Sequence, residues 1–465
     1  MLRGAVLGVI AGAAIATLPG RAGVVAAVAG ALAGGVAGWR FASGRAGFSP
    51  WSLAVLLFLM PALAMPVAPG ADMAMHVALA RGLLDGVLSP AWPGVSVQAY
   101  PRGFSALIAL LSPLGLARAG LLAAGISYLV FWAGLTAILE SLRTPAARTV
   151  AAVALLLSRT PQIFFDWGGN PSALALGLAL FGAAQEGPIA ALFFAGSAAV
   201  HPMGAVAGVL AFCTKRTFCT KRAWVAPLTG VAGLAAVVGA LAIFGPALSA
   251  RETHWLRDYA VTQERAGFGV LGDPANIATA LAVAWLLYKR DWRAVAVAAV
   301  AVVAMSALFK LAPYAGLYPA RFAPMLLVIV APLWARAAAA KIPLLGPVAI
   351  VLALPFHFRW YQSAEPIATF RDLTAIACVA KSTPPDAVVD GAYGDATQWI
   401  PALTGRAVTR PHQHVSLFDE TDAALAKLPR ATFRFVGERL RYPPPIGPPP
   451  PTAPLCDGAL WKIAQ

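Results

Sequence analysis

The chain has little charge and few of the residues that enzymes most often use for chemistry. Only 12% of its 465 residues are Asp, Glu, Lys or Arg, whereas 59% are hydrophobic, and the mean hydropathy is +0.72. This composition excludes an ordinary soluble protein. The four cysteines are too few for the disulfide framework of a small secreted fold.

Several catalytic and cofactor motifs are also missing. The sequence has no Walker-type glycine-rich loop, no Gly-x-Ser-x-Gly elbow and no Cys-x-x-Cys pair, which argues against an ATP-driven pump and a serine hydrolase. The repeated Cys-Thr-Lys-Arg units at 213–216 and 219–222 have no histidines beside them, so we expect no metal site there. Cys378 and Cys456 could pair if the C-terminal segment is extracytoplasmic, a point that the sequence leaves open.

What the chain has instead is a series of apolar stretches long enough to cross a hydrocarbon layer of about 30 Å as helices. The first begins directly after Arg3 and reads as an uncleaved span. We predict an α-helical polytopic membrane protein with about 13 spans. The predicted spans are residues 4–18, 22–39, 51–67, 119–139, 149–165, 171–184, 188–200, 204–212, 224–244, 275–288, 294–308, 322–334 and 342–356.

The basic residues predict the orientation of these spans. The formal net charge of +15 would suggest a nucleic-acid ligand in a soluble protein, but here Lys and Arg lie mainly between spans, as in the cytoplasmic loops of membrane proteins. We therefore expect contact with membrane lipid and none with nucleic acid. The predicted cytoplasmic residues are Arg40, Arg45, Arg143, Arg148, Lys215, Arg216, Lys221, Arg222, Lys289, Arg290, Arg293, Arg336 and Lys341.

This orientation requires residues 103–116 to lie in the interface without crossing the membrane. The N-terminus is then cytoplasmic, and the loops that hold the remaining polar residues share the outer face. If 103–116 does cross, every later assignment inverts. The transmembrane core, residues 1–356, includes outer juxtamembrane helices within 72–116.

A second domain is predicted at 357–465, where charges and turn residues return. A helical pattern at 369–381 precedes short alternating runs at 387–390, 432–436 and 459–463, which indicates a small extracytoplasmic α/β domain. The proline-rich segment 443–454 reads as a rigid surface connector, with a ligand for a proline-recognition module as the alternative.

Asp72 and His76 are the most informative polar residues in the core. They lie four positions apart in a predicted amphipathic helix, 71–88, and so share one face. A carboxylate and an imidazole at the edge of a membrane are costly, so we favour a functional role. The alternative is an N-capping aspartate and an interfacial histidine. Nearby, Tyr100 and Arg102 in Tyr-Pro-Arg-Gly could form an interfacial turn, or Arg102 could face a phosphate.

This layout resembles the GT-C membrane glycosyltransferases, which use polyprenyl-phosphate sugars as donors. The resemblance rests on an outer Asp after an early span, an amphipathic juxtamembrane helix and the Tyr-Pro-x-Gly segment that opens a second interfacial helix. In that family an outer acid, often one of an Asp-x-Asp pair, acts as the base toward the acceptor. Asp72 matches this acid, but the second acid is absent and His76 stands nearby. No cofactor is therefore required, and a divalent cation is the alternative.

The same resemblance assigns three further residues. Asp166 matches an acid of the second outer loop, although Gly-Gly-Asn-Pro after it also reads as a simple turn. His201 breaks an apolar hairpin, as a histidine does in many relatives, or it is structural. Arg321 matches the arginine that contacts the donor phosphate. The segment 393–406 resembles the outer domain of some such enzymes, with a loop that packs the domain onto the core as the alternative.

The resemblance implies a hexosyl- or pentosyltransferase in a bacterial inner membrane. It would move a sugar from a polyprenyl-phosphate donor to a lipid, glycan or protein acceptor, with Asp72 as the general base. His76 and Asp166 would assist at the catalytic centre, and Arg321, Arg102, His201 and Tyr100 would bind the donor phosphate. The alternative is a transporter or lipid-binding membrane protein without chemistry. No internal repeat of the kind that many transporters show is evident in the sequence.

Overall fold

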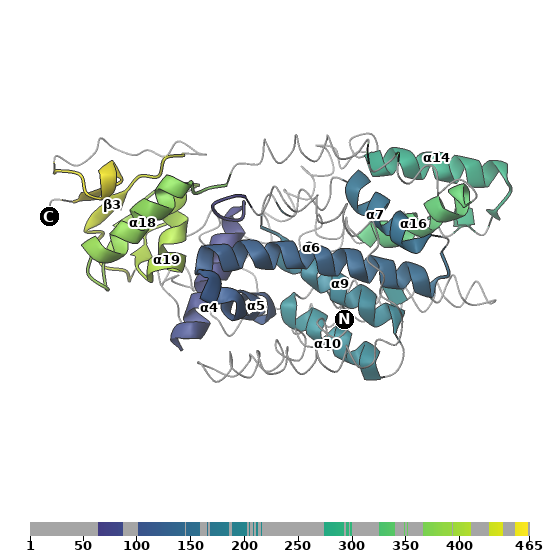
Figure 1. Ribbon diagram of the computed structural model, residues 1–465, viewed down its shortest axis with the longest axis horizontal. Coiled ribbons are helices and arrows are strands. Elements are labelled where there is room, and N and C mark those ends of the chain that lie inside the picture. The colour runs from purple at the N-terminus through teal and green to yellow at the C-terminus, as the bar shows by residue number, and fades with distance from the viewer. Residues whose placement is uncertain are drawn as a thin grey trace.

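The computed structural model describes residues 64–86, 101–144, 146–158, 168–185, 188–201, 274–292, 325–339, 366–392, 394–410, 427–439 and 452–463, with isolated residues between them. These residues form a mainly helical protein with one small sheet. Figure 1 shows the longest helix running along the long axis of the molecule and the sheet at one end.

Helix α6 (Leu116–Ser141) is the longest described element, with 26 residues, which corresponds to about 39 Å. It lies against α9 (Asn170–Ala184), which in turn lies against α10 (Pro188–Val200). The backbones of α6 and α9 approach closely at Gly134 and Gly177. A Cβ atom added to Gly177 would lie 2.6 Å from the carbonyl carbon of Val130. Small residues permit this contact, as in many pairs of membrane helices.

One of the described helices, α6, is long and apolar enough to cross a membrane. It covers the predicted span 119–139. The structure also has helices at the predicted spans 149–165, 171–184, 188–200, 275–288 and 322–334, and they are shorter than 18 residues. Among them, α7 (Ala147–Leu157) ends before the predicted boundary, because Ser158 is extended. The first three predicted spans lie largely or wholly outside the described residues, as do 224–244 and most of 342–356.

Two short helices pack at the start of α6. Helix α4 (Ala71–Asp85) ends at Gly86, whose φ of 70° closes the helix in the left-handed region. Helix α5 (Gly103–Leu111) continues into a 3-10 turn at Ser112–Leu114, and Gly115 with φ 89° redirects the chain into α6. With nine residues, α5 reaches about 14 Å, too short to cross a hydrocarbon layer of about 30 Å.

Helices α7, α14 (Pro274–Tyr288) and α16 (Met325–Ala338) pack together at the other end of α6 (Figure 1). An ion pair between Arg336 and Asp291 joins the ends of α14 and α16. A second pair, Arg148 Nε to Glu140 Oε1 at 3.4 Å, joins α7 to the end of α6. These residues lie far from α4 and α5 because α6 separates the two ends.

The C-terminal domain is an α/β unit, as predicted. Helix α18 (Phe370–Ser382) precedes β1 (Val388–Asp390), and α19 (Trp399–Thr404) precedes β2 (Ala407–Val408). With β3 (Phe433–Phe435) and β4 (Leu460–Lys462), the strands form a sheet of order β2-β1-β3-β4. The β1 strand pairs in parallel with both neighbours, and β3 and β4 are antiparallel. Most of the proline-rich segment 443–454 lies outside the described residues.

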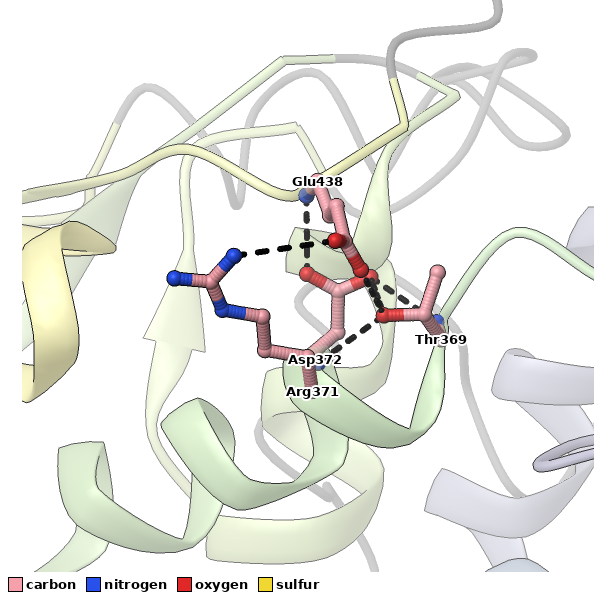
Figure 2. Close-up of polar contacts among 4 residues, drawn as sticks. All are labelled: Thr369, Arg371, Asp372 and Glu438. Carbon is pink, nitrogen blue, oxygen red and sulfur yellow. Dashed lines mark hydrogen bonds and ion pairs between the residues drawn. The ribbon is translucent and has the colours of Figure 1, made fainter.

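Buried carboxylates and one disulfide hold this domain together. At the start of α18, Asp372 accepts a hydrogen bond from Thr369 N (2.8 Å) and another from Glu438 N (2.8 Å), which ties the helix to the segment after β3 (Figure 2). Cys378 of α18 is bonded to Cys456, which precedes β4. The pairing that the sequence left open is therefore present in the structure.

Candidate active site

Asp72 and His76 both lie on α4, but their surroundings differ. Asp72, in the first turn, is half-buried, whereas His76 is only 2% exposed. The His76 ring meets Phe104 of α5 edge-on, with 5.2 Å between ring centroids. The ring is therefore enclosed between α4 and α5 and is not exposed on a surface.

The N-capping alternative for Asp72 is wrong. The residue before the helix is Gly70, with φ 92°, and Asp72 lies inside the first helical turn. A carboxylate there is favourable beside the positive end of the helix dipole. Gly168, which precedes α9, packs against this helix start. A Cβ atom added to Gly168 would lie 2.9 Å from Asp72 Cβ. The loop before α9 thus lies directly against Asp72.

The start of α5 meets the end of α10, and this contact brings Arg102 and His201 to one junction. A Cβ added to Gly103 would lie 2.9 Å from Val200 Cγ2 and 3.0 Å from the carbonyl oxygen of Ala199. Arg102 precedes Gly103, and His201 follows Val200 directly in the chain. His201 is buried, and its backbone N–H donates to Ser197 O at 3.0 Å. The predicted helix break at His201 is confirmed, since α10 ends at Val200.

The start of α9 adds polar residues that the sequence reading did not assign. Asn170 is fully buried, and its Nδ2 lies 3.0 Å from Met73 Sδ. Its Oδ1 atom and the Ser172 hydroxyl are buried and have no hydrogen-bond partner among the residues that the structure describes. Buried polar groups normally have partners, so these atoms beside the Asp72 turn are candidate contacts for a bound polar group. The only sequence signal was Gly-Gly-Asn-Pro, which is equally typical of a turn.

The C-terminal domain docks on the helix that carries Asp72. Helix α19 packs on α4, and Arg81 Nη1 donates to Leu403 O at 2.8 Å. Arg81 also pairs with Asp85, at 3.3 Å, on its own helix. Gly405, with φ 76°, ends α19 next to the Arg81 guanidinium. Helix α4 is consequently covered by α5, α6 and α19, so more than one face of this predicted amphipathic helix is buried.

The segment 394–406 has a structural role, as the packing alternative proposed. Arg406 Nη2 donates to Ala380 O and Thr383 O, both at 3.0 Å, and so closes the end of α18. Asp395 accepts backbone N–H groups from Thr397 at 2.8 Å and Gly437 at 3.1 Å. Burial raises the pKa of the Asp395 carboxyl to about 6, although these hydrogen bonds lower it.

Three of the seven predicted site residues lie outside the described part of the chain: Tyr100, Asp166 and Arg321. The other four, Asp72, His76, Arg102 and His201, lie at the junction of α4, α5, α9 and α10. Within the described ranges, no group of three or more His, Cys, Asp or Glu side chains is placed to hold a metal ion.

Comparison of the chain with protein-family models, with curated proteins and with solved structures finds no match. The chemistry of the site must therefore be argued from its residues. A half-buried carboxylate can accept a proton from a hydroxyl group, and a guanidinium and an imidazole nearby can bind an anion. Unsatisfied amide and hydroxyl oxygens add hydrogen-bonding capacity for a polyhydroxylated group.

Proposed function

We propose that the protein is a polytopic membrane glycosyltransferase of the GT-C kind, with about 13 spans. It would transfer a hexose or pentose from a polyprenyl-phosphate donor to a lipid, glycan or protein acceptor at the outer face of a bacterial inner membrane. The observation that carries the proposal is the packing of the helix ends beside these residues: the start of α5, after Arg102, lies against the end of α10, before His201, and the loop before α9 lies against Asp72. Polar residues gathered at one end of an apolar bundle favour a site there.

The distribution of charge supports the proposed orientation. Arg143, Arg148 and Glu140 lie at the end of α6, the full length of that helix away from α5. Lys215 Nζ donates to Ala184 O, at 3.2 Å, and so lies at the end of α9 opposite Asn170. Basic residues at the end far from the C-terminal domain agree with the tendency of Lys and Arg to stay in the cytoplasm.

The disulfide between Cys378 and Cys456 supports the same orientation. Structural disulfides form and persist in oxidising compartments and are rare in the bacterial cytosol. A C-terminal domain on the outer face would be in such a compartment. Since this domain contacts α4, the Asp72 turn would be on that side as well.

In the proposed reaction, Asp72 accepts the proton of the acceptor hydroxyl while that oxygen attacks the anomeric carbon of the donor. The bond from this carbon to the phosphate oxygen breaks, and the polyprenyl phosphate leaves. Arg102 and His201, with Arg321, would stabilise the negative charge of the leaving phosphate. Asp166 and Tyr100 remain proposed contacts, and buried His76 would act by holding α4 against α5. No cofactor is required in this scheme, and a divalent cation is the alternative.

The experiment is donor-dependent labelling of lipid and protein acceptors in membranes that contain the wild type or Asp72→Asn. The substitution removes the base but keeps the size of the side chain, so transfer should fall by 10²-fold or more, on the order of a general base's contribution. The matched control is Asp85→Asn, which makes the same change on α4 at an exposed carboxylate paired with half-buried Arg81 and should retain full activity. Both variants should insert and accumulate like the wild type.

Full transfer by Asp72→Asn would refute the base assignment. No transfer by the wild type across a range of polyprenyl-phosphate sugars, combined with substrate uptake into vesicles, would favour the transporter alternative. Binding of the lipid donor without turnover would instead favour a lipid-binding protein.

A further inference from the structure

Helix α14 presents one continuous apolar face that the described part of the chain leaves uncovered. Ile277, Leu281, Trp285 and Tyr288 recur at helical spacing, and each is between 46 and 74% exposed. Residues three and four apart share one side of a helix. An uncovered face of this composition is expected of a helix in contact with lipid chains.

The face ends in a cluster of aromatic and basic side chains. The Trp285 and Tyr288 rings have centroids 5.7 Å apart, and Lys289 Nζ lies 5.0 Å from the first ring and 5.6 Å from the second. Arg290 and Trp292 beside them are also exposed. Amphipathic rings prefer the level of lipid headgroups, and a Lys ammonium over the face of an aromatic ring is attracted to it.

Among the described residues, the acid next to this cluster, Asp291, does not neutralise its charge. Asp291 forms an ion pair with Arg336 of α16, and its Oδ1 accepts from Ala294 N at 3.3 Å. Lys289 and Arg290 therefore leave a net positive charge at the end of α14. This charge is complementary to a phosphate ester.

The backbone at Arg290 gives an independent reason to assign a role to its charge. The end of α14 has two closing hydrogen bonds, from Arg290 N to Leu287 O and from Asp291 N to Leu286 O, both 2.9 Å. This closure places Arg290 in the left-handed region, with φ 56°, where glycine is the favoured residue. The arginine is present despite its steric cost, so its charged side chain is expected to matter.

We propose that the end of α14 binds the headgroup of an anionic glycerophospholipid, with Lys289 and Arg290 on the phosphate and the rings at headgroup depth. The proposal rests on the proposed membrane topology, in which this end faces the cytoplasmic leaflet, but not on glycosyl transfer. Figure 1 shows α14 at the end of the molecule remote from the C-terminal domain. The site would therefore be separate from the candidate active site.

The test measures binding of phosphatidylglycerol and phosphatidylcholine to the purified full-length protein by native mass spectrometry. The wild type should retain phosphatidylglycerol in preference to phosphatidylcholine. Lys289→Ala and Arg290→Gly should each weaken phosphatidylglycerol binding about five-fold, the effect of one basic residue at an anionic surface. The control Lys381→Ala removes an exposed charge from the C-terminal domain and should leave binding unchanged.

Arg290→Gly separates lipid binding from folding. Because glycine adopts this backbone without steric cost, the variant should melt at or above the wild-type temperature while it binds less lipid. Equal retention of the two lipids by the wild type, or wild-type binding by both variants, would overturn the proposal. Competition by soluble glycerol phosphate at equal concentration would also overturn it, in favour of a site for free phosphate esters.

The outcome is distinguishable from failure of the proposed function. Selective lipid binding without any glycosyl transfer would leave the lipid site standing and remove only the enzyme. Failure of the wild type to enter bilayers would remove the topology on which the lipid site depends.

Discussion

The contact between α6 and α9 gives the sharpest structural prediction. Gly177 of α9 lies against the backbone of α6, so that a Cβ atom added there would be 2.6 Å from the carbonyl carbon and oxygen of Val130 and 2.7 Å from Phe131 N. These are backbone atoms, which cannot turn aside as a flexible side chain can. We therefore expect Gly177→Ala to force the two helices apart.

The size of the effect follows from two opposing contributions. To reach ordinary contact, the helices must separate by about 1 Å, and overpacking of this kind typically costs about 1–3 kcal/mol. Alanine favours a helix over glycine by about 1 kcal/mol, which offsets part of the cost. Gly125→Ala on α6 is the matched control, because nothing lies within 4 Å of a Cβ atom added there.

The measurement is thermal denaturation of the purified protein in detergent. Gly125→Ala should melt at or slightly above the wild-type temperature, whereas Gly177→Ala should be less stable than the control by about 2 kcal/mol. Gly134→Ala disrupts the same contact from the other helix. The double variant should therefore lose less than the sum of the two single losses, since one separation accommodates both methyl groups. Equal melting of the Gly177 and Gly125 variants would refute the close approach of the backbones.

Two further predictions concern the C-terminal domain. Cys378→Ser removes a disulfide that spans 78 positions, and loop-closure entropy predicts a loss of up to about 4.5 kcal/mol in the free energy of unfolding of this domain. Thermal denaturation with and without reductant measures this loss. A wild-type melting temperature that is insensitive to reductant would contradict the prediction. Asp395 is expected to make the domain lose stability as pH rises from about 4 to 6, because burial raises its pKa from 3.8 to about 6 and the folded state holds the proton more tightly. The expected loss in the free energy of unfolding is on the order of 3 kcal/mol. In denaturant titrations, Asp395→Asn should flatten the pH dependence of stability between about pH 4 and 6, whatever its effect on absolute stability. An unchanged pH dependence would show that another group is responsible.

Local features of the fold were predictable because they depend on neighbouring residues. The apolar stretch 119–139 became α6, and the alternating runs at 387–390, 432–436 and 459–463 became β1, β3 and β4. The helix predicted at 369–381 is α18, and Thr369 and Asp372 form a capping box at its start, which is a strictly local arrangement. In contrast, β2 has only two residues, too few for a periodic pattern.

The candidate site could be predicted only in part, since each side chain was visible but its neighbours were not. The polar character of Asp72 and His201 beside apolar stretches marked both as costly, which is a property of composition. That His76 is enclosed by Phe104, or that Asn170 lies against Met73, depends on α5 and α9 packing against α4. Contacts between residues so far apart in the chain leave no trace in a single sequence.

The sequence by itself determined where the chain is apolar, where helices and strands begin, and which few charged residues interrupt the hydrophobic stretches, because these follow from local composition and period. Only the tertiary structure decided that Cys378 pairs with Cys456, that α19 docks on α4 through Arg81, and that the start of α5 at Gly103 lies against the end of α10 at Val200. The physical reason is that such contacts depend on side-chain volume and backbone approach between distant segments, as at Gly103 and Gly177, where the absence of a side chain permits the contact.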